Sequence, residues 1–150
     1  MSIESKQVEL SLTEISSSDL IILPDNYKTD KNEFYSSNSI SLFKYLSHSL
    51  NVSFFNTPNS LSEQRSGDWY GPVLLFTSTA LSVNPHIVSI TCGLITNYLY
   101  DFFKSQKKPN VSLRVVYRDD ETRKSTELSY EGHIDGIESL KDAVLEISKK

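Results

Sequence analysis

The sequence predicts one α+β domain over residues 1–150, with a mixed or antiparallel sheet of three to five strands and helices on one face. Three observations predict this class. The 32 residues from Trp69 to Tyr100 contain no Asp, Glu, Lys or Arg, and the second half of this run has the composition of one long apolar helix. Two alternating segments within 111–131 indicate a β-hairpin, and the chain ends with apolar residues at helical spacing.

The first half of the chain predicts short strands around one helix. Apolar and polar residues alternate over 7–15, which is typical of a half-buried strand, and an apolar run over 20–23 indicates a second one. Apolar residues at helical spacing begin near Ser39 and predict a helix. A short strand over 52–55 is expected to follow it directly.

Two polar segments, at about 25–38 and 56–68, interrupt these elements and are expected to be loops. The chain of 150 residues is the size of one ordinary domain, and this length is sufficient to bury a single core. We therefore expect the loops to belong to one domain rather than to separate two.

The charge-free run predicts two helices, each introduced by a proline. Gly71–Pro72 precedes a helix expected over 73–81, because proline is well tolerated in a first helical turn. Asn84–Pro85 introduces the long central apolar helix, with Asn84 expected as its N-cap and its end expected near 105–108.

The last forty residues give the clearest pattern in the chain. Residues 111–118 alternate, acidic residues at 119–121 indicate a turn, and the alternation resumes over 124–131, which predicts the β-hairpin. Asp135 is expected to cap a final amphipathic helix. The apolar stripe of this helix consists of Ile137, Leu140, Val144 and Ile147.

Composition restricts the classes of function. The net charge of −4 disfavours a protein whose main partner is nucleic acid. The single cysteine, Cys92, excludes an internal disulfide and a cysteine zinc site; it is expected to be a small buried apolar residue, with a reactive thiol as the alternative. The first residues do not form a secretory signal, so the expected compartment is the cytoplasm. No motif in the chain predicts a catalytic, cofactor or metal site.

Two alternative functions remain open from the residues. Segment 73–103 has few charges and could anchor the chain in a membrane, although its Ser, Thr and Asn residues make insertion unfavourable. His133 and Asp135 would share one side of an extended segment, where a carboxylate can orient an imidazole for catalysis. A turn between strand and helix, with Asp135 as cap, explains the same pair.

Aromatic residues gather at both ends of the charge-free run. Because Trp and Tyr often dominate the binding energy of protein interfaces, we expect a contact surface for a protein partner or a second copy of the chain. Its expected residues are Trp69, Tyr70, Tyr100 and Phe103.

The second half of the chain resembles a family of small domains from bacterial conflict systems, the effector-associated constant components. The resemblance covers about half the chain and follows the order of its segments. These are Val88–Phe103, the break at Pro109–Asn110, V-S-L-R-V-V-Y, R-D-D-E-T and G-I-E-S-L-K-D-A-V. The resemblance implies a non-enzymatic adapter that links sensor and effector modules of a defence system.

Overall fold

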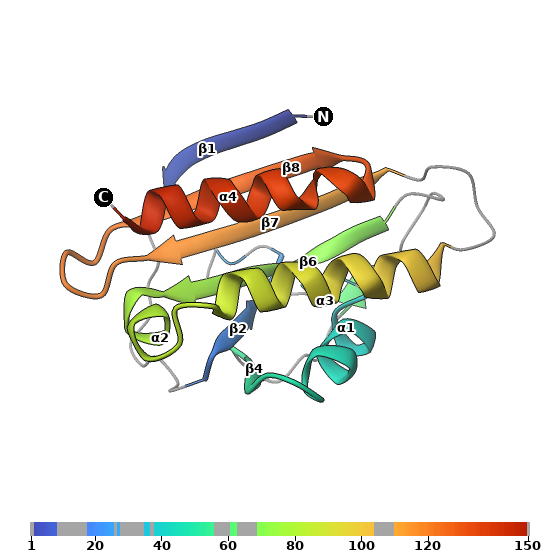
Figure 1. Cartoon of the computed structure of the whole chain (residues 1–150), viewed down its shortest axis with the longest axis horizontal. Coiled ribbons are helices and arrows are strands. Elements are labelled where there is room, and N and C mark those ends of the chain that lie inside the picture. Colours follow the sequence, from blue (N-terminus) through green and yellow to red (C-terminus); the bar gives the residue numbers. More distant parts are fainter. Residues whose placement is uncertain are drawn as a thin grey trace.

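The computed structural model describes residues 2–8, 18–25, 27, 35–36, 38–55, 61–62, 69–103 and 110–149 (Figure 1). Within these residues, six strands form one open mixed sheet in the order β1-β8-β7-β6-β2-β4. Along the chain these strands are β1 (Ser2–Val8), β2 (Leu20–Leu23), β4 (Val52–Phe54), β6 (Trp69–Thr77), β7 (Val111–Arg118) and β8 (Ser125–Gly132). A separate pair of two-residue strands, β3 (Tyr35–Ser36) and β5 (Leu61–Ser62), runs in parallel.

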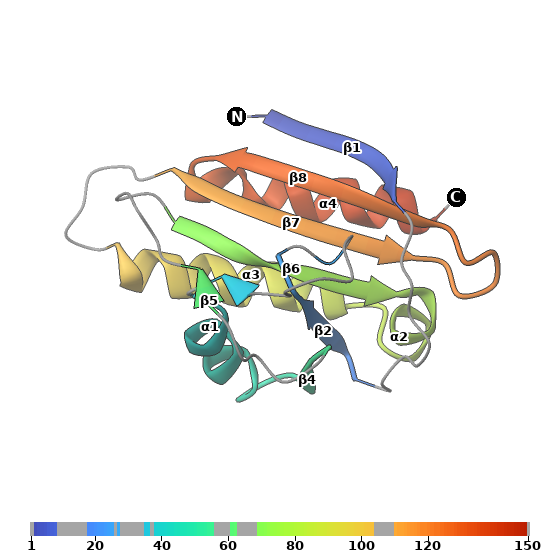
Figure 2. The ribbon, with the colours of Figure 1, turned by 180° about the vertical axis from the view of Figure 1, so that it is seen from behind.

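In the described part of the chain the helices are α1 (Ser39–Leu46), α2 (Ser78–Val83), α3 (Ile87–Phe102) and α4 (Ile137–Ser148), and the 3₁₀ turn η1 (Ile134–Gly136) precedes α4. Helices α3 and α4 lie side by side against one face of the sheet (Figure 1). Figure 2 shows the opposite face, where the strands lie in front of both helices. The α+β class with a mixed sheet is thus confirmed.

The core lies between the sheet and these two helices. Helix α3 buries Val88, Cys92, Ile95 and Leu99 against it, and α4 buries Ile137, Leu140 and Val144. A smaller apolar cluster lies on the opposite face and consists of Ile21, Leu23, Val73, Leu75 and Val116. The central strands β2 and β6 therefore bury side chains on both faces.

The prediction of a helix over 73–81 is wrong. Residues up to Thr77 form the strand β6, which runs parallel to β7 and antiparallel to β2. Only Ser78–Val83 are helical, and the hydroxyl of Thr77 accepts the N–H of Ala80 at 3.1 Å as the N-cap of α2. A strand buried on both faces is apolar without alternation, so its short run resembles a buried helix. With β6, the sheet has six strands, which is more than the predicted three to five.

The other predicted elements agree with the structure where it describes them. Strands β2 and β4, helices α1, α3 and α4 and the hairpin of β7 and β8 lie where the patterns place them. The strand expected over 7–15 overlaps β1 at two residues, and its remainder lies outside the described residues. Helix α3 ends at Phe102 with Phe103 as its C-cap, so the helix end expected near 105–108 was placed too late in the chain. The expected loops are mostly outside the described residues, although β3 and β5 fall within these two segments.

The two helix caps differ from the prediction. His86 is the N-cap of α3, and the side chain of Asn84, two residues earlier, accepts the His86 N–H at 3.2 Å. Gly136 is the N-cap of α4, while Asp135 accepts a hydrogen bond from the Tyr100 hydroxyl.

The charge-free run does not form one continuous apolar segment. It is divided among β6, α2 and α3, of which α3 has 16 residues. Among the described helices, none is both long enough and apolar enough to cross a membrane.

Candidate functional site

A groove runs between α3 and α4 on the outer side of the helix layer. It has a volume of about 540 Å³, which lies in the range of ligand sites in proteins. Helix α3 forms one wall, and η1 with the first turns of α4 forms the other. The lining residues are Ser89, Cys92, Gly93, Thr96, Asn97, Tyr100, Ile134, Asp135, Glu138 and Lys141. Most of these residues are exposed, so the groove is open to solvent along its length.

Gly93 leaves the α3 wall without a side chain at the middle of the groove. A Cβ atom built on Gly93 would meet no heavy atom within 4 Å, so packing within the described fold does not require glycine here. Glycine inside a helix costs about 0.5–1 kcal/mol relative to alanine. Gly93 therefore lowers the stability of helix α3. Because it has no side chain, it leaves the centre of the groove open.

Gly71 provides the contrast, because packing explains it fully. A Cβ on Gly71 would lie 2.5 Å from Cη2 of Trp69 and 2.9 Å from Cδ1 of Leu113. The indole ring can fill this place only because residue 71 has no side chain.

Charged groups concentrate on the α4 side of the groove. The Nζ atom of Lys141 lies 3.7 Å from a carboxylate oxygen of Glu138 and 3.5 Å from one of Asp142. Across the groove, the hydroxyl of Tyr100 donates to Asp135 and so joins α3 to η1. This hydrogen bond is the main reason why the pKa of the Tyr100 hydroxyl is raised. The groove thus contains fixed carboxylates, an amide, hydroxyls and one aromatic ring.

Cys92 forms part of the groove floor but does not offer a nucleophile. Its side chain is 5% exposed, and burial raises the pKa of the thiol to about 12. The thiol is therefore protonated at neutral pH, and a protonated thiol is a poor nucleophile. This agrees with the expected role of Cys92 as a buried apolar residue.

The four aromatic residues of the expected contact surface do not lie together. Trp69 and Phe103 are buried in the core, so the structure excludes them from an exposed surface. Trp69 packs edge-on against Tyr98 of α3, and because neighbouring strand residues point to opposite faces, Tyr70 points away from α3. Tyr70 and Tyr100 are each about half exposed, but only Tyr100 lines the groove.

Other aromatic residues form a continuous row from α1 to the end of α3. The ring of Tyr45 lies 5.3 Å from that of Tyr98, which lies 6.0 Å from that of Phe102. Phe102 is half exposed and packs edge-on against the buried Phe103. The sequence pattern placed the exposed aromatic residue at 103, whereas the helix rotation exposes 102.

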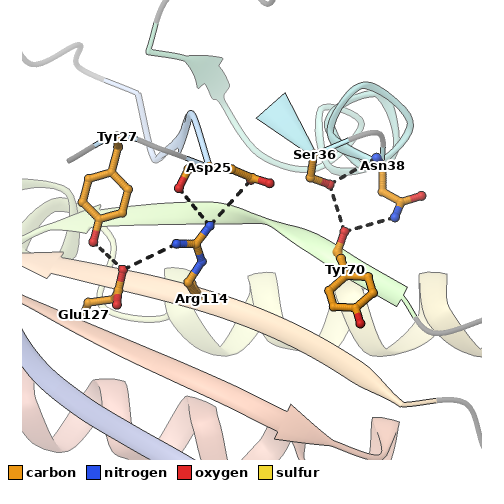
Figure 3. Close-up of polar contacts among 7 residues, drawn as sticks. All are labelled: Asp25, Tyr27, Ser36, Asn38, Tyr70, Arg114 and Glu127. Carbon is orange, nitrogen blue, oxygen red and sulfur yellow. Dashed lines mark hydrogen bonds and ion pairs between the residues drawn. The ribbon is translucent and has the colours of Figure 1, made fainter. Parts of the chain in front are cut away.

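A second polar cluster lies on the opposite face of the sheet (Figure 3). Glu127 of β8 is only 1% exposed there, with Lys6 of β1 at 3.3 Å and Arg114 of β7 at 3.9 Å. The hydroxyl of Tyr27 donates to Glu127 at 2.5 Å. Arg114 also donates to the backbone carbonyl of Asp25 at 3.0 Å, so the chain after β2 is held against the sheet.

A neighbouring set of contacts holds the turn before α1 against β6. The hydroxyl of Ser36 and the side-chain amide of Asn38 both donate to the backbone carbonyl of Tyr70, at 2.9 and 3.1 Å (Figure 3). The Ser36 hydroxyl in turn accepts the Asn38 N–H at 3.2 Å. Both clusters attach segments of the chain to the sheet, so their contacts are those of a structural support.

Of the expected pair His133 and Asp135, the structure places only one residue at the groove. Asp135 lines the groove, whereas the lining residues do not include His133. The backbone carbonyl of His133 accepts the Tyr130 hydroxyl at 2.5 Å, as in a turn between strand and helix. Among the described residues, no group of three or more His, Cys, Asp or Glu side chains is placed to hold a metal ion.

Most of the groove was not found from the sequence, which indicated only Tyr100 and Asp135. One signal was present: Ser89, Gly93 and Asn97 recur every four residues and so form a polar row on an otherwise apolar helix. Comparison with protein families, with curated proteins and with solved structures found no match to this chain.

Proposed function

We propose that this chain is a non-enzymatic interaction domain that binds a segment of a partner protein in the groove between α3 and α4. The observation that carries the proposal is Gly93, a helical glycine that has no packing reason and keeps the centre of the groove open. A chain under selection for stability alone would gain from alanine at this position.

The openness of the groove favours a peptide segment over a small molecule. Small-molecule sites bury about 70–90% of their ligand, which requires a closed cavity. Here Gly93, Asn97, Tyr100 and Glu138 are exposed along the rim, so a ligand would stay in contact with solvent on one side. An extended segment of a protein partner suits such a groove.

The wider biological role rests on the resemblance of the second half of the chain to effector-associated constant components. On that basis we propose that the domain links sensor and effector modules of a bacterial defence system. Binding by the groove would then provide one of the two links.

Peptide selection tests the binding function. Short random peptides displayed on phage would be selected against the immobilised chain, and the enriched peptides would be measured in solution by calorimetry. Gly93→Trp fills the groove from its open wall, and Gly93→Ala adds one methyl group there, which meets no heavy atom of the fold within 4 Å. We expect enriched peptides that bind the wild type best, Gly93→Ala more weakly and Gly93→Trp not at all. Equal binding to Gly93→Trp, or no enrichment, would refute the proposal.

A further inference from the structure

Resting on this proposed function, we infer that the bound segment is anchored by a basic side chain, a lysine or arginine that lies between Asp135 and Glu138. The charges of the groove and the exposure of their side chains carry this inference. Three carboxylates, those of Asp135, Glu138 and Asp142, lie in or beside the groove around one ammonium group, that of Lys141. Counted over the described residues, the groove therefore has two negative charges in excess.

The exposure of these side chains indicates which charge an approaching ligand meets first. The side chain of Lys141 is 24% exposed, whereas those of Glu138 and Asp142 are 78% and 69% exposed. The carboxylate side chains of Glu138 and Asp142 are therefore mostly exposed at the mouth of the groove, whereas most of the Lys141 side chain is covered. An approaching cation meets attractive charge at the mouth, and an approaching anion is repelled there.

Tyr100 supplies the third contact for a cation. Its hydroxyl is held by Asp135, which fixes the ring at the edge of the groove, and the ring is half exposed. Lysine and arginine bind favourably over the face of a tyrosine ring, with about 0.5–1 kcal/mol at exposed sites. Gly93 and Asn97 on the facing side of α3 leave room for the aliphatic part of the side chain.

The experiment compares three peptides that differ only in one central residue: arginine, glutamate or norleucine. Binding is followed by the amide resonance of Gly93 in ¹⁵N-labelled protein, which reports contact in the groove itself. We expect the arginine peptide to bind most tightly and to weaken as salt is added, because exposed charges are screened. Glu138→Gln and Asp135→Asn should each weaken it by up to about fivefold.

Two further variants separate the effect of overall charge from that of the groove, and the charge of Asp135 from its hydrogen bond to Tyr100. Glu121→Gln removes one exposed carboxylate from the β7–β8 turn and should leave the affinity unchanged. Tyr100→Phe keeps the ring but removes its hydrogen bond to Asp135, whereas Asp135→Asn removes the charge and keeps an oxygen that can accept this bond. We expect Asp135→Asn to weaken binding more than Tyr100→Phe. If Asp135→Asn binds as tightly as the wild type while Tyr100→Phe binds more weakly, Asp135 positions Tyr100 and does not contact the cation, which refutes that part of the inference.

The outcomes also distinguish this inference from the function on which it rests. If the glutamate or norleucine peptide binds as well as the arginine peptide, and Gly93→Trp abolishes that binding, the basic anchor is wrong and the peptide-binding function stands. If no peptide shifts the Gly93 resonance, the inference is refuted, and the phage selection decides the function separately.

Discussion

Tyr27 and Glu127 are one hundred positions apart in the sequence, yet the hydroxyl of Tyr27 donates to Oε1 of Glu127 at 2.5 Å. The acceptor is almost fully buried on the face of the sheet opposite α3 and α4. Hydrogen bonds to charged groups contribute more than neutral ones, because a buried carboxylate loses its hydration. This contact fixes the segment after β2 against the hairpin of β7 and β8.

Tyr27→Phe should therefore destabilise the fold by about 1–2 kcal/mol, since it removes a donor from a buried carboxylate and keeps the ring. Urea unfolding at neutral pH measures the difference. Tyr70→Phe is the matched control because that residue is half exposed, and its variant should stay within about 0.5 kcal/mol of the wild type. Similar values for both variants would show that the Tyr27 hydroxyl contributes nothing to stability.

Asp25 should make stability depend on pH with the opposite sign to a normal ion pair. Burial raises the pKa of its carboxyl, while Arg114 and the Ser36 N–H act in the other direction. A raised pKa in the folded state means that the stabilising contribution is complete below the ordinary value of 3.8 and is lost as the pH rises through the folded pKa.

Asp25→Asn should consequently be more stable than the wild type at neutral pH, and the two should converge below pH 3.8. The Arg114 bond to the backbone carbonyl of Asp25 survives in this variant. Unfolding free energies at both pH values test this, with Glu121→Gln as the control for loss of one negative charge. A less stable Asn variant at neutral pH would mean that attraction to Arg114 outweighs burial.

The two glycines Gly71 and Gly93 should respond to alanine with opposite signs. Gly71→Ala places a methyl group against Trp69 and Leu113, and overpacking of this kind costs about 1–3 kcal/mol. Gly93→Ala adds a methyl group in open space on a helix and should stabilise by about 0.5–1 kcal/mol. Thermal unfolding of both variants gives the two signs. A destabilised Gly93→Ala would contradict the claim that packing leaves this position free.

Cys92 should be alkylated slowly in the folded protein, although it lines the groove. Its side chain is 5% exposed, and burial keeps the thiol protonated, whereas alkylating reagents attack the thiolate. Reaction with iodoacetamide at slightly alkaline pH should be more than about tenfold slower than in denaturant. The chain has no other cysteine, so the mass of the intact chain reports this site alone. Equal rates would show that the thiol is accessible through the groove.

The aromatic residues show how far the sequence alone could reach towards the site. Adjacent residues of a strand point to opposite faces of the sheet, so Trp69 and Tyr70 lie on opposite faces because both belong to β6. Which of them entered the core depended on the face that α3 covers. The helix predicted over 73–81 concealed the strand and therefore this alternation. The sequence pattern also selected Phe103 as a contact residue, whereas it is Phe102 that is half exposed.

Short-range patterns were sufficient for the hairpin of β7 and β8, for α3 and for α4, because their periodicity is a local consequence of burying one face. The α+β class, the single cysteine and the charge-free run follow from composition in the same way. Only the tertiary structure decided that β6 lies in the middle of the sheet, with β7 on one side and β2 on the other. It also decided that α3 and α4 lie side by side and enclose the groove around Gly93, because strand order depends on contacts between residues far apart in the chain.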